Sequence, residues 1–292
     1  MILVAGIVNI ETTVRIEHFP IEYAKSRFTF HGITDRLGGV GYNVAAGLAR
    51  AVCPVRLAAM TGPDLAGGMI TQALQNHGGI DLSCLLPCLS HSLRSTILVD
   101  ESGRGAMFTD LKESQQIQWP VESYDQLFAG CDLAHCSNIN WALELAHEAT
   151  QRGLPVSTDV QAIADVVDDA YNRRFLAIAE LVFLSAENLQ LPPAEALATI
   201  LHHYPVQLAV ATLGQHGCMA LGRGWPSPVH QAAQPIARLA NVTGAGDAFA
   251  AGFLSELSRR GVARQAVAPM PPHMVEAAMA AGQAAAAKKI AG

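Results

Sequence analysis

The residues of this chain best suited to chemistry form one short segment, Gly244 to Asp247, which reads Gly-Ala-Gly-Asp. The apolar run that follows, from Ala248 to Leu257, predicts a buried helix whose first turn is this segment. Free backbone N–H groups at a helix start attract anions, and small residues let phosphate oxygens approach the backbone closely. A carboxylate beside such a cradle can accept the proton of an attacking hydroxyl group. The segment predicts a phosphoryl-transfer site, although a tight glycine turn with Asp247 as a helix cap would fit the same residues.

A second glycine-rich element lies far upstream, where Gly38, Gly39, Gly41 and Asn43 run into a helix predicted over residues 42–52. Together the two elements resemble the signature regions of the ribokinase-like family, the carbohydrate kinases of the PfkB type. The resemblance covers essentially the whole chain. It implies a ribokinase-like three-layer αβα sandwich with a mainly parallel sheet and a small β lid over the substrate. It also implies transfer of the γ-phosphate of ATP to a primary hydroxyl of a sugar or nucleoside.

The resemblance also assigns roles to individual residues. Asp247 would accept the hydroxyl proton while the N–H groups of Ala245 and Gly246 hold the developing charge, and we expect a carboxyl of low basicity at this helix start. The residues expected to bind the substrate are Asn9, Glu11, Gly38, Gly39 and Asn43. Glu11 departs from the family, where Asp is usual, so the hydroxyl pattern that it binds is expected to differ. Glu11 as an exposed strand-end acid and Asn43 as a helix cap remain alternatives.

The nucleotide side rests on the element Thr212 to Gly217, which reads Thr-Leu-Gly-Gln-His-Gly. It resembles the Thr-x-Gly-x-x-Gly element that lines the phosphate and ribose region in these kinases, although a hairpin turn with two glycines would read the same. The residues expected to bind the nucleotide are Glu187, Thr212, Gly214, Gly217 and Thr243. The C-terminal helix predicted over 274–289 would pack near the adenine, or serve only as a packing helix.

The metal ions are the part of the resemblance with most departures. Glu187 to Gln190 reads Glu-x-x-Gln, where the family usually carries the Asn-x-x-Glu element that helps to organise Mg²⁺. Two alternatives stay open: Glu187 supplies the lost charge from three positions earlier, or the motif is simply eroded. In both cases Mg²⁺ with ATP remains the expectation. Asn241 and Thr243 belong to a loop that binds a monovalent cation in many relatives. Asn replaces the usual Asp at the first position, which leaves K⁺ activation open.

The substrate is the least determined feature. Val40 stands where ribokinase and many kinases of phosphorylated sugars carry Lys, and the variant Gly-Gly-Val-Gly-x-Asn is similar to that of pseudouridine kinases. This favours a nucleoside or an unphosphorylated sugar. Arginines at 27, 36, 94 and 104 keep a phosphosugar kinase open. Because the departures occur together, a nucleotide-binding regulator that has lost catalysis is a further alternative. The Gly39-Val-Gly41 turn does not follow the first predicted strand directly, which disfavours a dinucleotide-binding oxidoreductase.

Composition and periodicity are consistent with one α/β domain spanning residues 1–292, with lid segments over roughly 11–37 and 90–112. Buried strands are predicted over 2–8, 55–60, 133–136, 155–158, 181–184 and 207–211. Helices are predicted over 65–77, 124–129, 141–152, 173–179 and 193–203. Lid strands are predicted over 11–18, 27–30, 94–99 and 106–109.

The net charge of −6 and the absence of a long apolar run argue against nucleic-acid and membrane partners, so we expect a cytoplasmic protein. The six cysteines lack zinc spacing, and we expect neither a bound metal nor a disulfide from them. The expected partner is a small-molecule substrate, a sugar or a nucleoside. The family resemblance also implies a homodimer formed through the lid strands.

Overall fold

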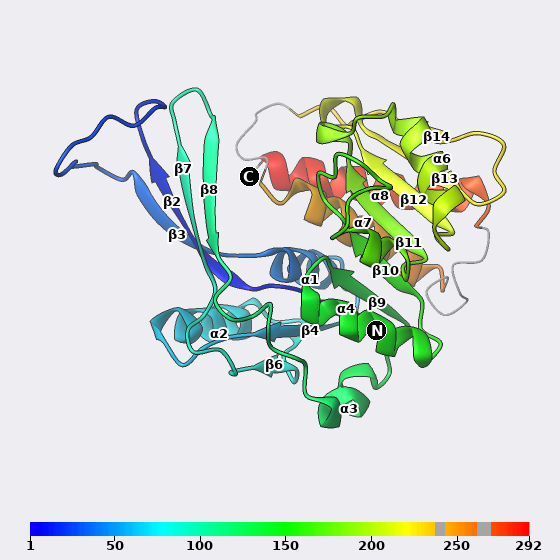
Figure 1. Ribbon diagram of the computed structural model, residues 1–292, viewed down its shortest axis with the longest axis horizontal. Helices are drawn as coiled ribbons and strands as arrows, with labels where there is room; N and C mark the ends of the chain where they lie inside the picture. The colour runs from blue at the N-terminus through cyan, green and yellow to red at the C-terminus, as the bar shows by residue number, and fades with distance from the viewer. Residues whose placement is uncertain (237–242, 262–269, 292) are drawn as a thin grey trace.

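The computed structural model describes residues 1–236, 243–261 and 270–291, and their centre is a twisted, mainly parallel sheet (Figure 1). Its strand order is β14-β13-β12-β11-β10-β9-β1-β4-β5, and β6 pairs with β4. The strands are β1 (Ile2–Ala5), β4 (Val55–Met60), β5 (Ile80–Asp81), β6 (Leu85–Leu86), β9 (Leu133–Ser137), β10 (Val156–Asp159), β11 (Leu181–Ser185), β12 (Leu208–Thr212), β13 (Cys218–Gly222) and β14 (Val229–Gln231). Among the described strands of this sheet, the pairings β12·β13 and β13·β14 are antiparallel and the others are parallel.

Helices cover both faces of this sheet, because each central strand buries apolar side chains on both sides. One layer contains α1 (Val40–Arg50), α2 (Leu65–His77), α7 (Ala245–Arg259) and α8 (Pro272–Ala291). The other contains α3 (Tyr124–Phe128), α4 (Asn140–Gln151), α5 (Arg173–Leu176) and α6 (Pro193–His203). Short 3₁₀ turns lie at η1 (Val121–Ser123), η2 (Ala186–Asn188) and η3 (Gly214–His216). The three-layer sandwich predicted from the sequence is thus confirmed.

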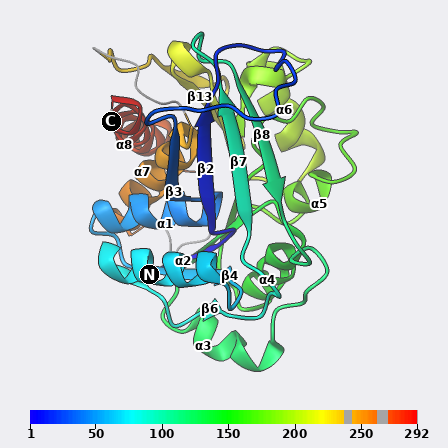
Figure 2. The same ribbon diagram turned by 90° about the vertical axis from the view of Figure 1, so that its left-hand side faces the viewer.

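A second sheet stands beside the sandwich, and the four strands β3-β2-β7-β8 run side by side in Figure 2. They are β2 (Asn9–Arg15), β3 (Ile33–Gly38), β7 (Arg94–Val99) and β8 (Gly105–Asp110). β2 follows β1 after three residues, and β3 leads directly into the glycine pair before α1. This sheet is therefore joined to the sandwich by the short link after β1 and by the glycine pair before α1. We call it the lid sheet from here on.

Several predicted boundaries differ from the structure. The first strand ends at Ala5, three residues earlier than predicted, and Asn9 already belongs to the lid sheet. Between them, Gly6 packs against Gly41 and Ser137 with no room for a side chain. The predicted lid strand over 27–30 is wrong: those residues are exposed and lie outside any strand, and the partner of β2 is β3. None of the described helices combines the length and apolar character that crossing a membrane requires.

Candidate active site

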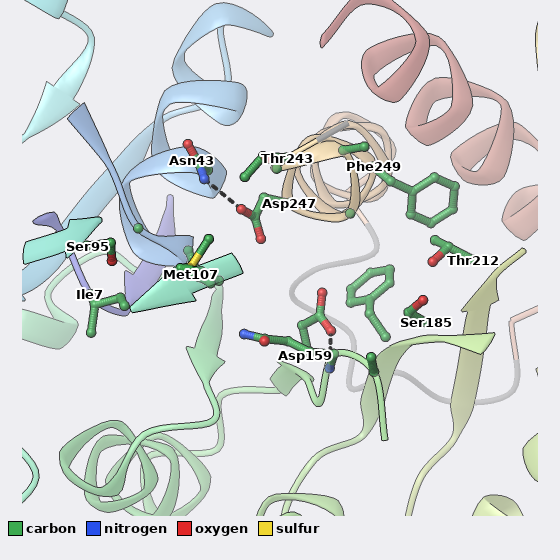
Figure 3. Close-up of a pocket in the computed structure, with 18 of the residues that line it drawn as sticks. Ile7, Asn43, Ser95, Met107, Asp159, Ser185, Thr212, Thr243, Asp247 and Phe249 are labelled. Carbon is green, nitrogen blue, oxygen red and sulfur yellow. Dashed lines mark hydrogen bonds between the residues drawn. The ribbon is translucent and has the colours of Figure 1, made fainter. Parts of the chain in front are cut away.

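A cavity of about 390 Å³ opens between the lid sheet and the carboxyl ends of the central strands (Figure 3). Asp159, Ser185 and Thr212 are the last residues of β10, β11 and β12, so the parallel sheet brings all three to one edge. From the opposite side come the lid residues Asn9, Glu11, Ser95, Met107 and Thr109. The start of α1 and the start of α7 close the remaining side through Gly39, Val40, Asn43 and the segment Thr243 to Asp247. The two glycine-rich elements predicted to cooperate therefore line one cavity.

Asp247 lies in the first turn of α7 and points toward Asn43 in the first turn of α1 (Figure 3). The Nδ2 group of Asn43 donates a hydrogen bond of 2.7 Å to Oδ2 of Asp247. Gly244 caps α7 with a φ of 78°, a left-handed conformation that favours glycine. The helix thus begins at Ala245, one residue later than predicted. Asn43 thus orients the carboxylate of Asp247 and also lines the cavity, so its predicted contact with substrate stays a prediction. It does not cap α1, whose N-cap is Gly39 without a side-chain hydrogen bond.

The pKa of Asp247 lies well above that of an exposed aspartate. Burial raises it, the hydrogen bond from Asn43 lowers it, and the carboxylates of Asp159 and Glu11 raise it further, while the Lys289 ammonium lowers it; the resulting pKa is about 7. The sequence led us to expect low basicity from the helix start alone. Burial of the carboxyl is the main cause of the difference, and the carboxylates of Asp159 and Glu11, from distant segments, add to it. A carboxyl group with a pKa near neutrality is well matched to accepting a proton at neutral pH.

Glu11 is 5% exposed and is held by Arg36 across the β2·β3 pair. The Nε and Nη2 groups of Arg36 donate to Oε2 of Glu11 at 2.8 and 2.7 Å. The longer side chain that Glu has over Asp lies over Gly38, where an added Cβ would sit 2.2 Å from Cδ of Glu11. The structure therefore does not support an exposed strand-end acid at this position. Gly38 is needed because it leaves room for that carboxylate.

A second cavity, of about 670 Å³, adjoins the first along α7. Thr212, Gly214, Gly217 and Glu187 line it, together with the α8 residues Gln283, Ala286, Ala287 and Ile290. The Thr212 to Gly217 element proves to be the hairpin between β12 and β13, so the turn and the cavity wall are the same residues. Residues that line both cavities are Ser185, Thr212, Ala245, Gly246 and Phe249. The start of α7 therefore lies at the junction of the two cavities.

The residues predicted for the two metal sites, one for Mg²⁺ and one for a monovalent cation, line different cavities as far as they are described. Glu187 faces the larger cavity, whereas Gln190 lines a small separate cavity behind it, and its N–H donates to the carbonyl of Ala164. Thr243 lines the cavity beneath the lid, and Asn241 lies outside the described residues. Across the described part of the chain, no three His, Cys, Asp or Glu side chains gather closely enough to bind a metal by themselves.

Four residues at this site were missed by the sequence reasoning. Asp159 ends β10, and burial raises the pKa of its carboxyl, which accepts the N–H of Gln161 at 2.7 Å. Ser95 and Thr109 face the cavity from β7 and β8. Lys289, on α8, packs its Cε 3.4 Å from the position of a Cβ on Gly244. A polar residue at the end of a buried strand was a usable signal for Asp159, while Lys289 carried none.

Comparison with known families identifies the chain. The model of the pfkB family carbohydrate kinases matches residues 1–291. The chain belongs to this family. A curated relative of this pfkB-family chain, the acarbose 7(IV)-phosphotransferase of Actinoplanes sp., is 27% identical over 262 residues, covering 87% of this chain and 83% of the relative. The fructokinase of Salmonella typhimurium is 29% identical over 244 residues, covering 77% and 78%.

Solved structures give the same fold. A microbiome-derived acarbose kinase superposes with a TM-score of 0.82 at 24% identity, covering 98% of this chain and 92% of its own. The ribokinase of Thermotoga maritima gives a TM-score of 0.76 at 19% identity, covering 100% and 93%. These likenesses confirm the ribokinase-like fold that the two glycine-rich elements led us to expect.

Proposed function

We propose that this pfkB-family protein is an ATP-dependent kinase that phosphorylates a primary hydroxyl group of an unphosphorylated sugar. The observation that carries the proposal is the position of the α7 start: Ala245 and Gly246 line both cavities, and Asp247, in the same turn, lines the cavity beneath the lid. ATP would occupy the larger cavity with its adenine against α8, and the sugar would occupy the cavity beneath the lid sheet. The γ-phosphate then meets the sugar hydroxyl at Ala245 and Gly246, whose N–H groups face it.

Asp247 acts as the general base in this proposal. It takes the proton of the hydroxyl group as that oxygen attacks the γ-phosphorus and the bond to the β-phosphate oxygen breaks, which releases ADP. Asn43 holds the carboxylate in place through the 2.7 Å hydrogen bond. Removal of a positioned base typically costs on the order of 10²- to 10⁴-fold in rate.

The charge of the cavity beneath the lid favours an unphosphorylated substrate. Three carboxylates line it, from Glu11, Asp159 and Asp247, and no Lys, Arg or His of the described residues does so. A phosphosugar would place its phosphate among these carboxylates without a counter-ion. None of the four arginines that kept this alternative open lines the cavity. Arg36 pairs with the cavity residue Glu11, and Arg104 pairs with Asp100. Arg27 donates to the carbonyl of Glu22, and Arg94 donates to Oγ1 of Thr12. The sugar named for each curated relative, acarbose or fructose, makes an unphosphorylated sugar a better candidate than a nucleoside.

Mg²⁺ fits the donor set of the junction. Mg²⁺ prefers carboxylate, phosphate and water oxygens and often takes only one or two ligands from the protein. Glu187, exposed in the larger cavity, and Asp159, at the end of β10, offer such oxygens on the two sides of the junction. Bound there with ATP, the ion would neutralise charge on the phosphates. Whether K⁺ takes part is left to the assay below.

The test is ATP consumption with Mg²⁺, with and without K⁺, for D-fructose, D-glucose, D-ribose, acarbose, uridine and fructose 6-phosphate. We expect one neutral sugar to give the highest kcat/KM, and Asp247→Asn to lose most turnover while retaining ATP binding. Full turnover by Asp247→Asn would refute the role of Asp247, and preference for fructose 6-phosphate would refute the substrate class. ATP binding without turnover of any acceptor would favour a regulator.

Assembly and location complete the proposal. Apolar side chains on the segment between β2 and β3 are fully open to solvent: Tyr23 is 95%, Phe28 90% and Phe30 89% exposed. Such a group is commonly covered by a partner, which supports a homodimer formed through the lid sheets. Light scattering should give twice the monomer mass, and Phe28→Asp with Phe30→Asp should return the monomer. Dependence on ATP makes the cytoplasm the expected location.

A further inference from the structure

Three polar side chains cross the inner face of the lid sheet as one hydrogen-bonded chain. Nδ2 of Asn9 donates to Oγ of Ser95 at 2.7 Å, and Oγ of Ser95 lies 3.0 Å from Oγ1 of Thr109. The three residues come from β2, β7 and β8, and Ser95 is directly opposite Thr109 in the β7·β8 pair. All three line the cavity proposed to hold the sugar. The chain is therefore built into the wall that faces the substrate.

The direction of the hydrogen bonds follows from the donors available. Ser95 is 2% exposed and accepts a hydrogen bond from Asn9. Oγ1 of Thr109 lies within reach of the Ser95 hydroxyl, so we infer that Ser95 donates and Thr109 accepts in that bond. The hydroxyl proton of Thr109 is then free to point into the cavity. At the other end, Oδ1 of Asn9 is buried and has no hydrogen-bond partner among the described residues, although Asn9 is only 1% exposed. The chain thus presents one acceptor and one donor to the substrate.

A buried polar atom without a partner is costly, and Oδ1 of Asn9 therefore indicates a missing ligand group. A hydroxyl group matches it, because it can donate to Asn9 and accept from Thr109, either alone or through its vicinal neighbour. Water would satisfy the same atoms, but the adjoining Met107 and Ile7 give the cavity wall an apolar rim on which a sugar ring can pack. Figure 3 shows Ser95, Met107 and Ile7 on the same side of the cavity, facing Asp247 and Asp159.

We propose that Asn9, Ser95 and Thr109 form a directional relay that selects a substrate hydroxyl group distant from the one phosphorylated, with Ser95 and Thr109 as specificity-determining residues. The inference rests on the proposed sugar-kinase function. It adds that the lid sheet, and not only the α1 and α7 glycine elements, determines which sugar is accepted. A substrate lacking that hydroxyl leaves the buried acceptor of Asn9 and the donor of Thr109 unpaired, which is the arrangement by which binding sites reject deoxy analogues most strongly.

The relay is tested by pairing variants with deoxy substrates. Wild type, Ser95→Ala and Thr109→Val are assayed on D-fructose, D-glucose and D-ribose, and the best of these is compared with its monodeoxy analogues. Thr96→Val is the control, because Thr96 lies next to Ser95 on β7 and is exposed on the opposite face of that strand. Thr109→Ser keeps the hydroxyl and should rescue activity. Melting temperatures of all variants establish that the fold is retained.

We expect Thr109→Val to lower kcat/KM for the parent sugar about 10- to 100-fold. For the wild type, kcat/KM on one monodeoxy analogue should be lower than on the parent sugar by a similar factor. For Thr109→Val, the kcat/KM values on that analogue and on its parent should agree within about threefold. On the other deoxy analogues, kcat/KM should fall by the same factor in the wild type and in Thr109→Val. The relay is refuted if Thr109→Val behaves like wild type, if it loses the same factor on every analogue, or if Thr96→Val loses as much. If wild type turns over none of the sugars, the proposed function fails first and this inference falls with it.

Discussion

The pKa of Asp247 gives a pH dependence that distinguishes this site from an ordinary aspartate. With a pKa of about 7 for the carboxyl, against 3.8 for an unperturbed one, kcat/KM should rise with pH and level off above neutrality. The sign follows from the role: the base acts only when deprotonated, so activity is lost as pH falls through the pKa. At pH 6, about one tenth of the protein carries the carboxylate, so kcat/KM should be about tenfold below its plateau. An unperturbed aspartate would leave the rate flat down to about pH 5.

The fall of kcat/KM on the acid side of the pH profile is called the acid limb below. Two variants should shift this acid limb in opposite directions along the pH axis. Asp159→Asn removes a negative charge that raises the pKa of Asp247, so the limb should shift to lower pH. Lys289→Met removes a positive charge that lowers the same pKa, so the limb should shift to higher pH. Because Asp159 lines the cavity, its variant is also expected to lower the plateau. The position of the limb, and not the plateau, is the quantity compared.

The assay is coupled ADP release from pH 5 to 9 at subsaturating sugar and ATP. The terminal phosphate of ATP also titrates near neutrality, and it contributes the same limb to all three proteins. A limb at one fixed pH in wild type, Asp159→Asn and Lys289→Met would assign it to the nucleotide and refute the role of Asp247. Shifts of both variants in one direction would refute the electrostatic argument while leaving a titrating base in place.

Three further predictions concern the same site. An added Cβ on Gly246 would meet no protein atom, so Gly246→Ala should raise the free energy of unfolding by about 0.5–1 kcal/mol. The same methyl group should abolish most turnover, because it would obstruct the phosphate. Gly68→Ala is the control: its added Cβ in α2 also meets no protein atom, so it should stabilise the fold by a similar amount and leave kcat unchanged. Asp247→Asn should raise the melting temperature by ~2 °C at pH 8 and by less at pH 5. The raised pKa means that the ionised carboxyl lowers the stability of the folded state, starting above about pH 4 and reaching its full effect above about pH 7. An equal gain in melting temperature at pH 5 and pH 8 would contradict this. Arg36→Met should weaken sugar binding more than ATP binding, measured by calorimetry, because Glu11 would lose the partner that fixes its carboxylate.

The central sheet was accessible to sequence reasoning because its signals are local. Strand β4 and helices α2 and α6 have the bounds that periodicity predicted, each a short apolar run or an amphipathic stretch ended by glycine, proline or a polar residue. The lid sheet was only half predictable. Strand β7 has the predicted bounds, whereas the alternating residues 27–30 gave a false strand, because alternation predicts a half-buried face and the structure leaves them exposed with nothing to pack on.

The site shows the same division between local and long-range information. The N-terminal cradle of α7 is a local device, and its glycines and Asp247 could be identified from four consecutive residues. What sets the pKa of Asp247 is not local: the fold first buries its carboxyl, and it then brings up Asn43 as a hydrogen-bond donor and the charges of Asp159, Glu11 and Lys289 from other segments. Sequence patterns could therefore name Asp247 as the proposed base but could not predict its pKa, which depends on burial and on distances between residues that are far apart in the chain.

The selection of substrate is subject to the same limit, and this explains why the sequence left the sugar open. Ser95 and Thr109 are unremarkable polar residues of two amphipathic strands, where serine and threonine usually face solvent. They become a pair because the β7·β8 register sets them opposite each other, and they gain a direction because Asn9, on a third strand, donates into them. A one-residue slip of that register would turn Thr109 away from the cavity and replace it by its neighbour on the opposite face. In the proposed relay, specificity is encoded by strand register as much as by residue identity, so a relative with the same glycine elements but a different residue opposite Ser95 should accept a different sugar.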